Sequence, residues 1–154
     1  MNIFQLLKPK ALTAYVNEDM TLRQAIEKMR HHGFTAIPVI NNEGHYVKTL
    51  AEGDFMWFML ANDIGELNEL GGYCVRDLPV RVRCKPVYVD STIGDLFKLS
   101  MNQNFVPVVD DRDVFIGIVT RRDILQACYE ALKDSEMFSE QPEYVREEEQ
   151  DGEL

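Results

Sequence analysis

An internal repeat with an offset of 69 residues, the distance from Pro38 to Pro107, constrains this chain more than any other feature. At this offset the segment 37–56, IPVINNEGHYVKTLAEGDFM, lies over the segment 106–125, VPVVDDRDVFIGIVTRRDIL, without a gap. Each copy has an apolar run that contains a proline, then a four-residue polar turn and a second apolar run. An aspartate then opens a helix-like segment. A fixed offset of this kind indicates two tandem copies of one supersecondary unit.

The sequence upstream of each proline also repeats, with short gaps. The segment 14–29, AYVNEDMTLRQAIEKM, parallels the segment 87–101, VYVDSTIGDLFKLSM, and each opens on a strand-like entry that ends at Val16 or Val89. Apolar residues at helical spacing follow in both copies. They are Leu22, Ala25, Ile26 and Met29 in the first copy, and Ile93, Leu96, Phe97 and Met101 in the second. Each unit is therefore predicted to run strand, helix, strand, strand, helix.

The two units are predicted to form one α+β domain. A unit of about 55 residues buries little surface by itself, so we expect the two copies to pack together with pseudo-twofold symmetry. The predicted boundaries are 3–60 for the first repeat, 61–74 for a linker, 75–132 for the second repeat and 133–154 for an acidic tail, disordered at its end. Ligand clefts are expected where the two copies meet.

Charge and composition exclude several classes of function. The net charge is −10, but the segment 134–154 holds nine acidic residues and one basic residue, so the rest of the chain is nearly neutral. It has no basic stripe for a nucleic acid. No apolar run approaches the roughly 20 residues of a membrane-spanning helix, and the first residues are too polar for a signal peptide. We therefore predict a cytoplasmic protein with neither a membrane nor a nucleic-acid partner.

The cysteines and histidines indicate neither a metal site nor catalysis. The three cysteines are widely spaced and fit neither a disulfide framework nor a C-x-x-C zinc site, so they are predicted to be reduced thiols. The three histidines have no carboxylate or cysteine at ligand spacing. No nucleophile, general base or phosphate-binding glycine loop emerges. The chain is therefore predicted not to be an enzyme and to hold no metal or cofactor.

Two adjacent arginines stand at the start of the last predicted helix, in Thr120-Arg121-Arg122-Asp123. A helix N-terminus presents free N–H groups and a partial positive charge, and arginine adds a planar donor that fits phosphate oxygens. Asp123 can accept hydrogen bonds from ribose hydroxyls. The same residues also form a capping box, in which Thr120 caps the helix and Asp123 reaches back. Taken by itself the segment favours an ordinary helix start, but a capped helix end can still face a cleft and bind a nucleotide.

The first copy differs at the equivalent positions, Ala51-Glu52-Gly53-Asp54. The hydroxyl is missing and a carboxylate, which repels phosphate, stands where the second copy has Arg121. Lys48 also replaces Gly117. We therefore predict one nucleotide site per chain, on the side of the second repeat's arginines, with the other cleft empty or altered.

The segments GFTAIPVI (33–40), NFVPVVDD (104–111) and GIVTRRD (117–123) resemble the motifs of CBS domains. Two ordered copies resemble a tandem CBS pair, or Bateman module, over residues 3–132. This resemblance implies a regulatory sensor that binds an adenosine-containing ligand between its repeats. It also implies a disc-shaped homodimer that signals through an effector protein.

More narrowly, the chain resembles the small stand-alone bacterial CBS-pair proteins that bind cyclic di-AMP. That resemblance implies ligand contacts from Ala14, Thr35, Ala36, Arg121 and Arg122. AMP, ADP or ATP is the alternative ligand, because its phosphates would suit the same arginines. A lysine expected two residues before Ala14 is Leu12 here, and Lys10 is the substitute that the sequence offers. The full predicted ligand-binding set is Ala14, Tyr15, Thr35, Ala36, Ile37, Pro38, Thr120, Arg121, Arg122 and Asp123.

The segment 54–60, DFMWFML, is rich in large apolar residues and contains the single tryptophan. We expect this helix to be buried in a homodimer interface or to bind an effector protein. The alternative to a nucleotide sensor is therefore a ligand-independent dimeric scaffold that docks partners through this helix or through the acidic tail.

Overall fold

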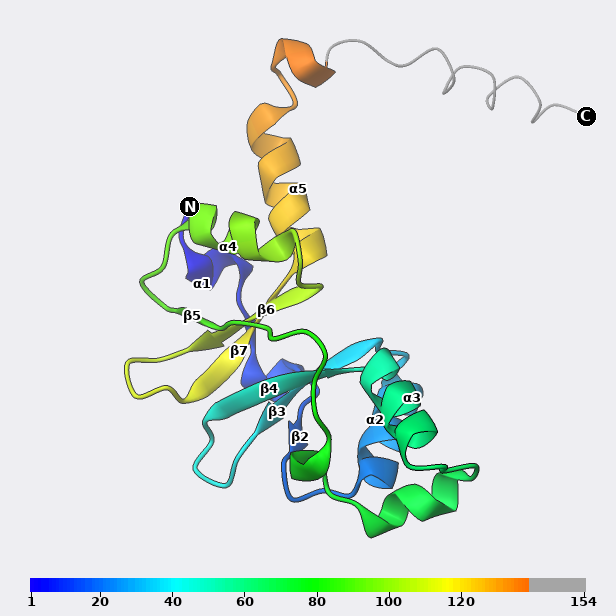
Figure 1. The fold of residues 1–154 in the computed structure, drawn as a ribbon. Helices are drawn as coiled ribbons and strands as arrows, with labels where there is room; N and C mark the ends of the chain where they lie inside the picture. The colour runs from blue at the N-terminus through cyan, green and yellow to red at the C-terminus, as the bar shows by residue number, and fades with distance from the viewer. Residues whose placement is uncertain (139–154) are drawn as a thin grey trace, which may run out of the picture.

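The computed structural model describes residues 1–138 and shows two similar halves, each a small sheet with helices beside it (Figure 1). The first half contains β2 (Val16–Asn17), α2 (Leu22–His32), β3 (Ala36–Ile40), β4 (Tyr46–Ala51) and α3 (Glu52–Ala61). The second half contains β5 (Val87–Tyr88), α4 (Ile93–Ser100), β6 (Phe105–Val109), β7 (Phe115–Thr120) and α5 (Arg121–Leu132). This order confirms the predicted α+β fold of two β-α-β-β-α repeats.

The two sheets have the same topology at their centres. In the first repeat β2 lies parallel to β3 and β3 lies antiparallel to β4, and in the second repeat β5, β6 and β7 are related in the same way. The prolines hold equivalent positions, because Pro38 lies opposite Thr49 and Pro107 lies opposite Ile118. The bounds of β3 and β6, and of β4 and β7, differ by the 69 residues that the repeat predicts.

Equivalent residues of the two repeats meet each other where the halves join. His45 forms an isolated antiparallel bridge with Val114, its own counterpart at the 69-residue offset. The Phe115 N–H donates to the Gly44 carbonyl at 2.9 Å, and the Asn104 amide lies 3.5 Å from the hydroxyl of its counterpart Thr35. These self-matching contacts indicate a pseudo-twofold axis between the repeats.

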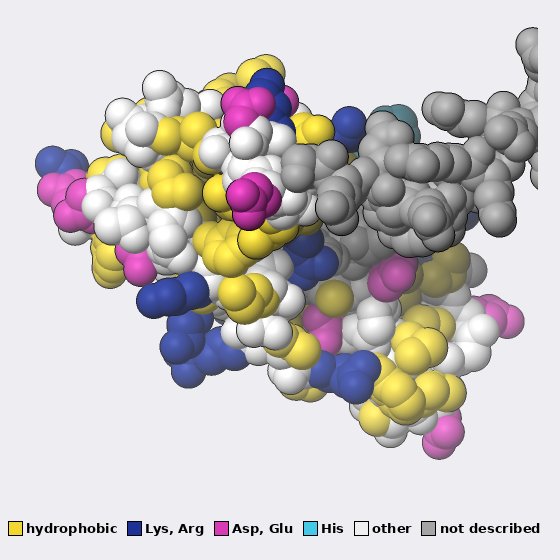
Figure 2. All heavy atoms as spheres, turned by 90° about the horizontal axis from the view of Figure 1, so that it is seen from above, with side chains coloured by type: hydrophobic (Ala, Val, Ile, Leu, Met, Phe, Trp, Pro, Cys, Tyr) yellow, Lys and Arg dark blue, Asp and Glu magenta, His cyan; other side chains and the backbone are white. Residues whose placement is uncertain are grey.

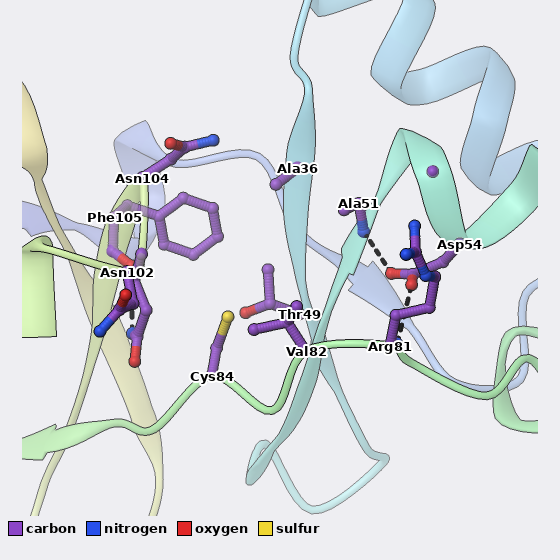
Figure 3. A pocket seen from close by; sticks show the side chains of 12 residues that line it. Ala36, Thr49, Ala51, Asp54, Arg81, Val82, Cys84, Asn102, Asn104 and Phe105 are labelled. Atoms are coloured by element: carbon purple, nitrogen blue, oxygen red, sulfur yellow. Dashed lines mark hydrogen bonds between the residues drawn. The ribbon is translucent and has the colours of Figure 1, made fainter.

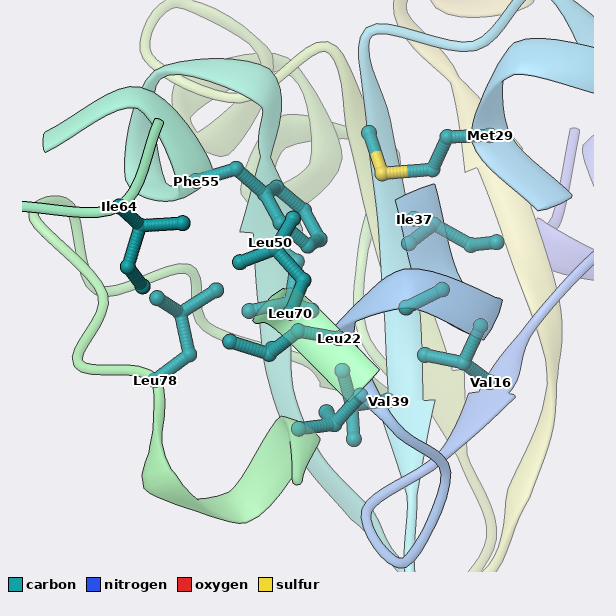
Figure 4. Packing of buried hydrophobic residues seen from close by; sticks show 12 residues of the cluster. Val16, Leu22, Met29, Ile37, Val39, Leu50, Phe55, Ile64, Leu70 and Leu78 are labelled. Carbon is teal, nitrogen blue, oxygen red and sulfur yellow. The ribbon is translucent and has the colours of Figure 1, made fainter. Parts of the chain in front are cut away.

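The core of the first repeat extends beyond its predicted boundary (Figure 4). Leu22, Leu50 and the fully buried Phe55 come from α2, β4 and α3. Three buried residues between the repeats complete this core, and the chain there forms the short 3-10 helices η2 (Leu67–Gly72) and η3 (Val75–Asp77). They are Leu70, Val75 and Leu78. Leu70 belongs to the predicted linker, whereas Val75 and Leu78 belong to the start of the predicted second repeat, so both segments pack against the first repeat.

The N-terminal segment crosses to the second repeat. It contains α1 (Ile3–Leu6), β1 (Lys8–Pro9) and the 3-10 helix η1 (Lys10–Leu12). Ile3 is buried in the second core, and β1 pairs antiparallel with β7, with Lys8 opposite Ile118 and Pro9 opposite Gly117. Residues 3–9, which the sequence analysis assigns to the first repeat, thus pack on the second repeat, and Lys8–Pro9 extend its sheet.

The upstream alignment of the two copies is wrong by two residues at the entry strand. Val16 pairs with Val39, and the equivalent partner of Val108 is Val87 rather than Val89. At the end of α4 the alignment is wrong by one residue, because the counterpart of Met29 is Ser100: Ser100 is buried and Met101 is 66% exposed. The Ser100 hydroxyl is satisfied at this buried position because it donates to the Phe97 carbonyl at 2.7 Å.

The chain after α5 forms a short 3-10 helix, η4 (Glu136–Phe138). Most of the acidic tail predicted for 133–154 lies outside the described residues. Within residues 1–138, no helix is both long enough and apolar enough to span a membrane.

Candidate functional site

A cleft of about 240 Å³ lies between the repeats, and we name it the Thr120 cleft. Its walls come from both repeats and from the N-terminal crossing segment, because β1, the start of β3, the start of β6 and the end of β7 converge there. It is lined by Lys8, Thr13, Ala14, Gly33, Phe34, Thr35, Ala36, Pro38, Asn104, Phe105, Ile118 and Thr120. The lining is mostly apolar, with hydroxyl and amide groups at several points.

The structure brings half of the predicted ligand-binding set together in this cleft. Ala14, Thr35, Ala36, Pro38 and Thr120 line it. The two alanines have small side chains, as expected beside a flat ring, and Asn104, Phe105, Ile118 and Thr120 of the second repeat line the same cleft.

The other predicted residues lie elsewhere. Ile37 is fully buried in the first core, and the ring of Tyr15 packs edge-on against Phe115 at a centroid distance of 6.2 Å. Arg121 and Arg122 line a separate, shallow recess on α5 together with Leu125, Gln126 and Tyr129. This recess begins directly after Thr120, so it adjoins the cleft along the chain.

Arg121 is engaged within the second repeat. Its Nε donates to the carbonyl of Ser100 at 2.7 Å and to that of Gln103 at 3.2 Å, so the guanidinium holds the C-terminal end of α4. Its backbone N–H donates to the Asn104 carbonyl at 2.9 Å. Both contacts give this arginine a structural role at the start of α5.

Thr120 caps α5 as predicted, but the Asp123 side chain reaches back to the Thr120 hydroxyl and not to its backbone N–H. The Thr120 hydroxyl accepts a hydrogen bond from the Asp123 N–H at 3.1 Å and donates to the Asp123 carboxylate at 2.6 Å. Asp123 is exposed. A carboxylate can accept several hydrogen bonds, so the cap leaves it capacity for a ligand.

Sequence reasoning missed seven lining residues: Lys8, Thr13, Gly33, Phe34, Asn104, Phe105 and Ile118. Asn104 could have been found, because the repeat offset makes it the counterpart of the predicted Thr35. Lys8 had no such signal, since its position depends on the pairing of β1 with β7. The proposed substitute Lys10 instead places its Nζ 5.1 Å from the ring centre of Tyr15.

The pseudo-twofold partner of this site is a cleft of about 200 Å³, which we name the Asp54 cleft (Figure 3). Asp54 is buried, and both of its carboxylate oxygens accept backbone hydrogen bonds, from Ala51 at 2.8 Å and from Arg81 at 3.0 Å. Its counterpart Asp123 is exposed. The segment 81–84 thus lies along this cleft, held by the aspartate, as Figure 3 shows.

The polar groups near the Asp54 cleft are mostly satisfied by one another. The Tyr46 hydroxyl lies 2.7 Å from the Thr49 hydroxyl and 3.3 Å from the Cys84 carbonyl. Burial raises the pKa of Tyr46 and also that of the Cys84 thiol, so both groups are neutral at pH 7. These neutral, internally bonded groups offer little to a phosphate, and the Asp54 carboxylate in the lining would repel one.

Lys48, which replaces the glycine of the second copy, ties the inter-repeat segment to β4. Its Nζ donates to the carbonyls of Val75 at 2.8 Å and Leu78 at 2.6 Å. Partial burial lowers the pKa of Lys48, and nearby carboxylates, including Asp54, act against this shift. This lysine therefore stabilises the segment that leads into the Asp54 cleft.

A model of the CBS domain matches residues 11–61 and 75–130, which is more than half of the chain. The chain belongs to the CBS domain family. Its two matched segments form one CBS pair, with the two clefts between the repeats. Within residues 1–138, no group of three or more histidine, cysteine or acidic side chains is placed to hold a metal ion.

Three known proteins place this CBS pair among its relatives. The uncharacterized protein MJ1426 of Methanocaldococcus jannaschii is 28% identical over 143 residues, covering 73% of this chain and 83% of the relative. CbpB, solved in complex with c-di-AMP, is 24% identical with a TM-score of 0.74, covering 87% and 88% of the two chains. CBSX2, solved in complex with AMP, is 20% identical with a TM-score of 0.67, covering 84% and 98%. The two structures share the fold of this chain.

Proposed function

We propose that this CBS pair is a regulatory sensor of adenine nucleotides, that its ligand occupies the Thr120 cleft, and that cyclic di-AMP is that ligand. The observation that carries the proposal is the lining of this cleft: small alanines, apolar side chains and hydroxyls from both repeats, with one lysine and no carboxylate. Few polar groups on apolar walls are typical of a small-molecule site. The complexes of CbpB with c-di-AMP and of CBSX2 with AMP support an adenine ligand.

Each part of a nucleotide finds a matching group at this cleft. Ala14 and Ala36 leave room for the base beside Ile118. Thr120 lines the cleft, and the adjacent Asp123 carboxylate can accept from ribose hydroxyls. The Asp54 cleft lacks this arrangement, because its aspartate is already bonded to two backbone N–H groups. We therefore propose one site per chain.

The size of the cleft bears on the choice between cyclic and linear ligands. At about 240 Å³ it is slightly below the roughly 300–1,000 Å³ of most small-molecule pockets. It therefore holds one nucleoside portion, and the second half of cyclic di-AMP lies outside. The recess of Arg121 and Arg122 directly follows Thr120 and offers positive charge for that half. AMP, ADP or ATP is the alternative ligand.

Calorimetry with a panel of cyclic di-AMP, AMP and ATP tests the proposal. We expect cyclic di-AMP to bind with a Kd at or below the micromolar range, about −8 kcal/mol. Replacing Ala14 by Phe fills the Thr120 cleft and should abolish binding. The matched variant Ala51→Phe, in the Asp54 cleft, should bind as the wild type does. Binding of AMP or ATP without cyclic di-AMP would select the alternative ligand, and equal loss in both variants would contradict the choice of cleft.

A ligand-independent scaffold is the second candidate function, and the exposed helix faces favour it. On α3, Met56, Trp57 and Leu60 are 47–64% exposed. On α5, Leu125, Tyr129 and Leu132 are 45–52% exposed. Apolar side chains are spread over the face seen from above in Figure 2, the side on which α4 and α5 lie in Figure 1. We propose that α3 and α5 form a homodimer interface, whether or not a nucleotide is bound.

Sedimentation velocity tests this interface. The wild type should sediment as a dimer, and Trp57→Ser should shift it toward the monomer by removing a large apolar contact. The control Leu67→Ser changes a residue that is 44% exposed outside both helices and should leave the dimer intact. If the wild type sediments as a monomer, the proposed homodimer interface is wrong. A dimer whose thermal stability no nucleotide changes would favour the scaffold, since a ligand at 100 times its Kd adds about 2.7 kcal/mol.

A further inference from the structure

The Thr120 cleft contains a single ionisable side chain among the described residues that line it, that of Lys8. The Asp54 cleft, by contrast, has both Asp54 and Arg81 in its lining. Within residues 1–138, no carboxylate pairs with the Lys8 ammonium group. Lys8 also lines a neighbouring recess with Asp123 and Glu130, but it is the one cationic residue in the described lining of the Thr120 cleft, and it comes from outside the repeat motifs.

The backbone fixes the position of Lys8 at the wall of the cleft. Lys8 pairs with Ile118 in the β1–β7 ladder, and the Thr13 hydroxyl donates to the carbonyls of Lys8 at 3.3 Å and Pro9 at 2.9 Å. β1 approaches β7 so closely that a Cβ built on Gly117 would lie 2.2 Å from the Lys8 carbonyl oxygen. Ile3, buried in the second core, anchors the segment on its other side.

The other cations near this end of the molecule are already engaged or lie outside the cleft. The Lys10 ammonium lies over the Tyr15 ring, and the Lys28 ammonium donates to the Tyr15 carbonyl at 2.6 Å. Arg121 bonds to the carbonyls at the end of α4. Arg122 lines the recess on α5.

We propose that Lys8 binds the phosphate of the nucleotide portion seated in the Thr120 cleft, an inference that rests on the proposed function. The phosphate-binding group then belongs to the crossing strand β1, which joins the start of the chain to the second repeat. The arginine pair serves a different group, the part of a dinucleotide that extends beyond the cleft. The specificity for phosphate thus comes from a residue that no repeat motif contains.

Comparing adenosine with AMP isolates this contact, because the two ligands differ by the phosphate. For the wild type we expect the Kd of AMP to be lower than that of adenosine by on the order of tenfold or more, the effect of one charged hydrogen bond. In Lys8→Gln the two Kd values should become nearly equal while adenosine binding is unchanged. Lys10→Gln should keep the wild-type ratio, and the double variant Arg121→Ala/Arg122→Ala tests whether the arginines bind this phosphate instead. Thermal unfolding confirms that each variant folds.

The outcomes separate this inference from the proposal beneath it. A wild type that binds neither adenosine, AMP nor cyclic di-AMP overturns the proposed function and the role of Lys8 with it. A wild type that binds adenosine as tightly as AMP keeps the nucleotide site and overturns the role of Lys8. If Lys8→Gln keeps the wild-type ratio of the adenosine and AMP Kd values and the arginine double variant loses it, the arginines bind the phosphate instead.

Discussion

Replacing Gly117 by Val should lower the free energy of unfolding by about 1–3 kcal/mol, the usual cost of forcing atoms into a packed site. A Cβ at this position would lie 2.2 Å from the Lys8 carbonyl oxygen and 3.1 Å from the Lys8 carbonyl carbon. Backbone atoms cannot move aside as a flexible side chain can, so β1 must separate from β7. We expect AMP affinity to fall as well, because Lys8 leaves the cleft with β1. Urea unfolding and calorimetry measure the two effects.

Gly65→Val provides the control, because a Cβ there meets nothing within 4 Å. Its free energy of unfolding should stay near that of the wild type. If Gly117→Val were as stable as this control, the close approach of β1 to β7 would be wrong. Loss of stability with unchanged AMP affinity would keep the strand contact and contradict the placement of Lys8 in the cleft.

Replacing Asp54 by Ala should lower the free energy of unfolding by about 2–4 kcal/mol. The buried carboxylate accepts the N–H groups of Ala51 and Arg81, and each N–H left without a partner costs about 1–3 kcal/mol. The segment 79–82 should also lose its attachment to α3. Urea unfolding gives the stability, and hydrogen exchange at the Arg81 amide reports the local release.

The second repeat supplies the matched control, Asp123→Ala. Asp123 is exposed and makes its side-chain hydrogen bond to the Thr120 hydroxyl, so its loss should cost well under the cost of Asp54→Ala, about 0.5 kcal/mol as for most surface changes. Equal costs at the two positions would show that Asp54 has no special structural role. The asymmetry between the two clefts would then lose its main support.

Much of the fold could be predicted because the same local pattern of apolar and polar residues occurs twice in the chain. The turns, the proline-containing strands and the helix starts depend on neighbours within a few residues, and the offset from Pro38 to Pro107 holds from β3 to α5. Upstream of the two prolines, where the alignment of the copies needed gaps, it was wrong. Val89 took the place of Val87, because an alternating strand looks the same after a shift of two residues. At the end of α4 Met101 took the place of Ser100, because an apolar side chain was expected at the buried position.

The candidate site was predicted only in part, because its lining depends on contacts between distant segments. Ala36 and Thr120 belong to motifs that the sequence shows directly. Lys8 reaches the cleft through its pairing with Ile118, which no local pattern indicates. Asp54 and Asp123 look identical in the sequence, and the Arg81 backbone N–H, 27 residues away, is what makes Asp54 structural.

The crossing of the first residues to the second repeat also bears on how the protein is made. Ile3 and Lys8 take their places against strand β7, whose residues are among the last of the core to leave a ribosome. Contacts so far apart in sequence slow the search for the native state. During synthesis the segment around Ile3 therefore has to wait, with this apolar side chain uncovered, until β7 has been translated.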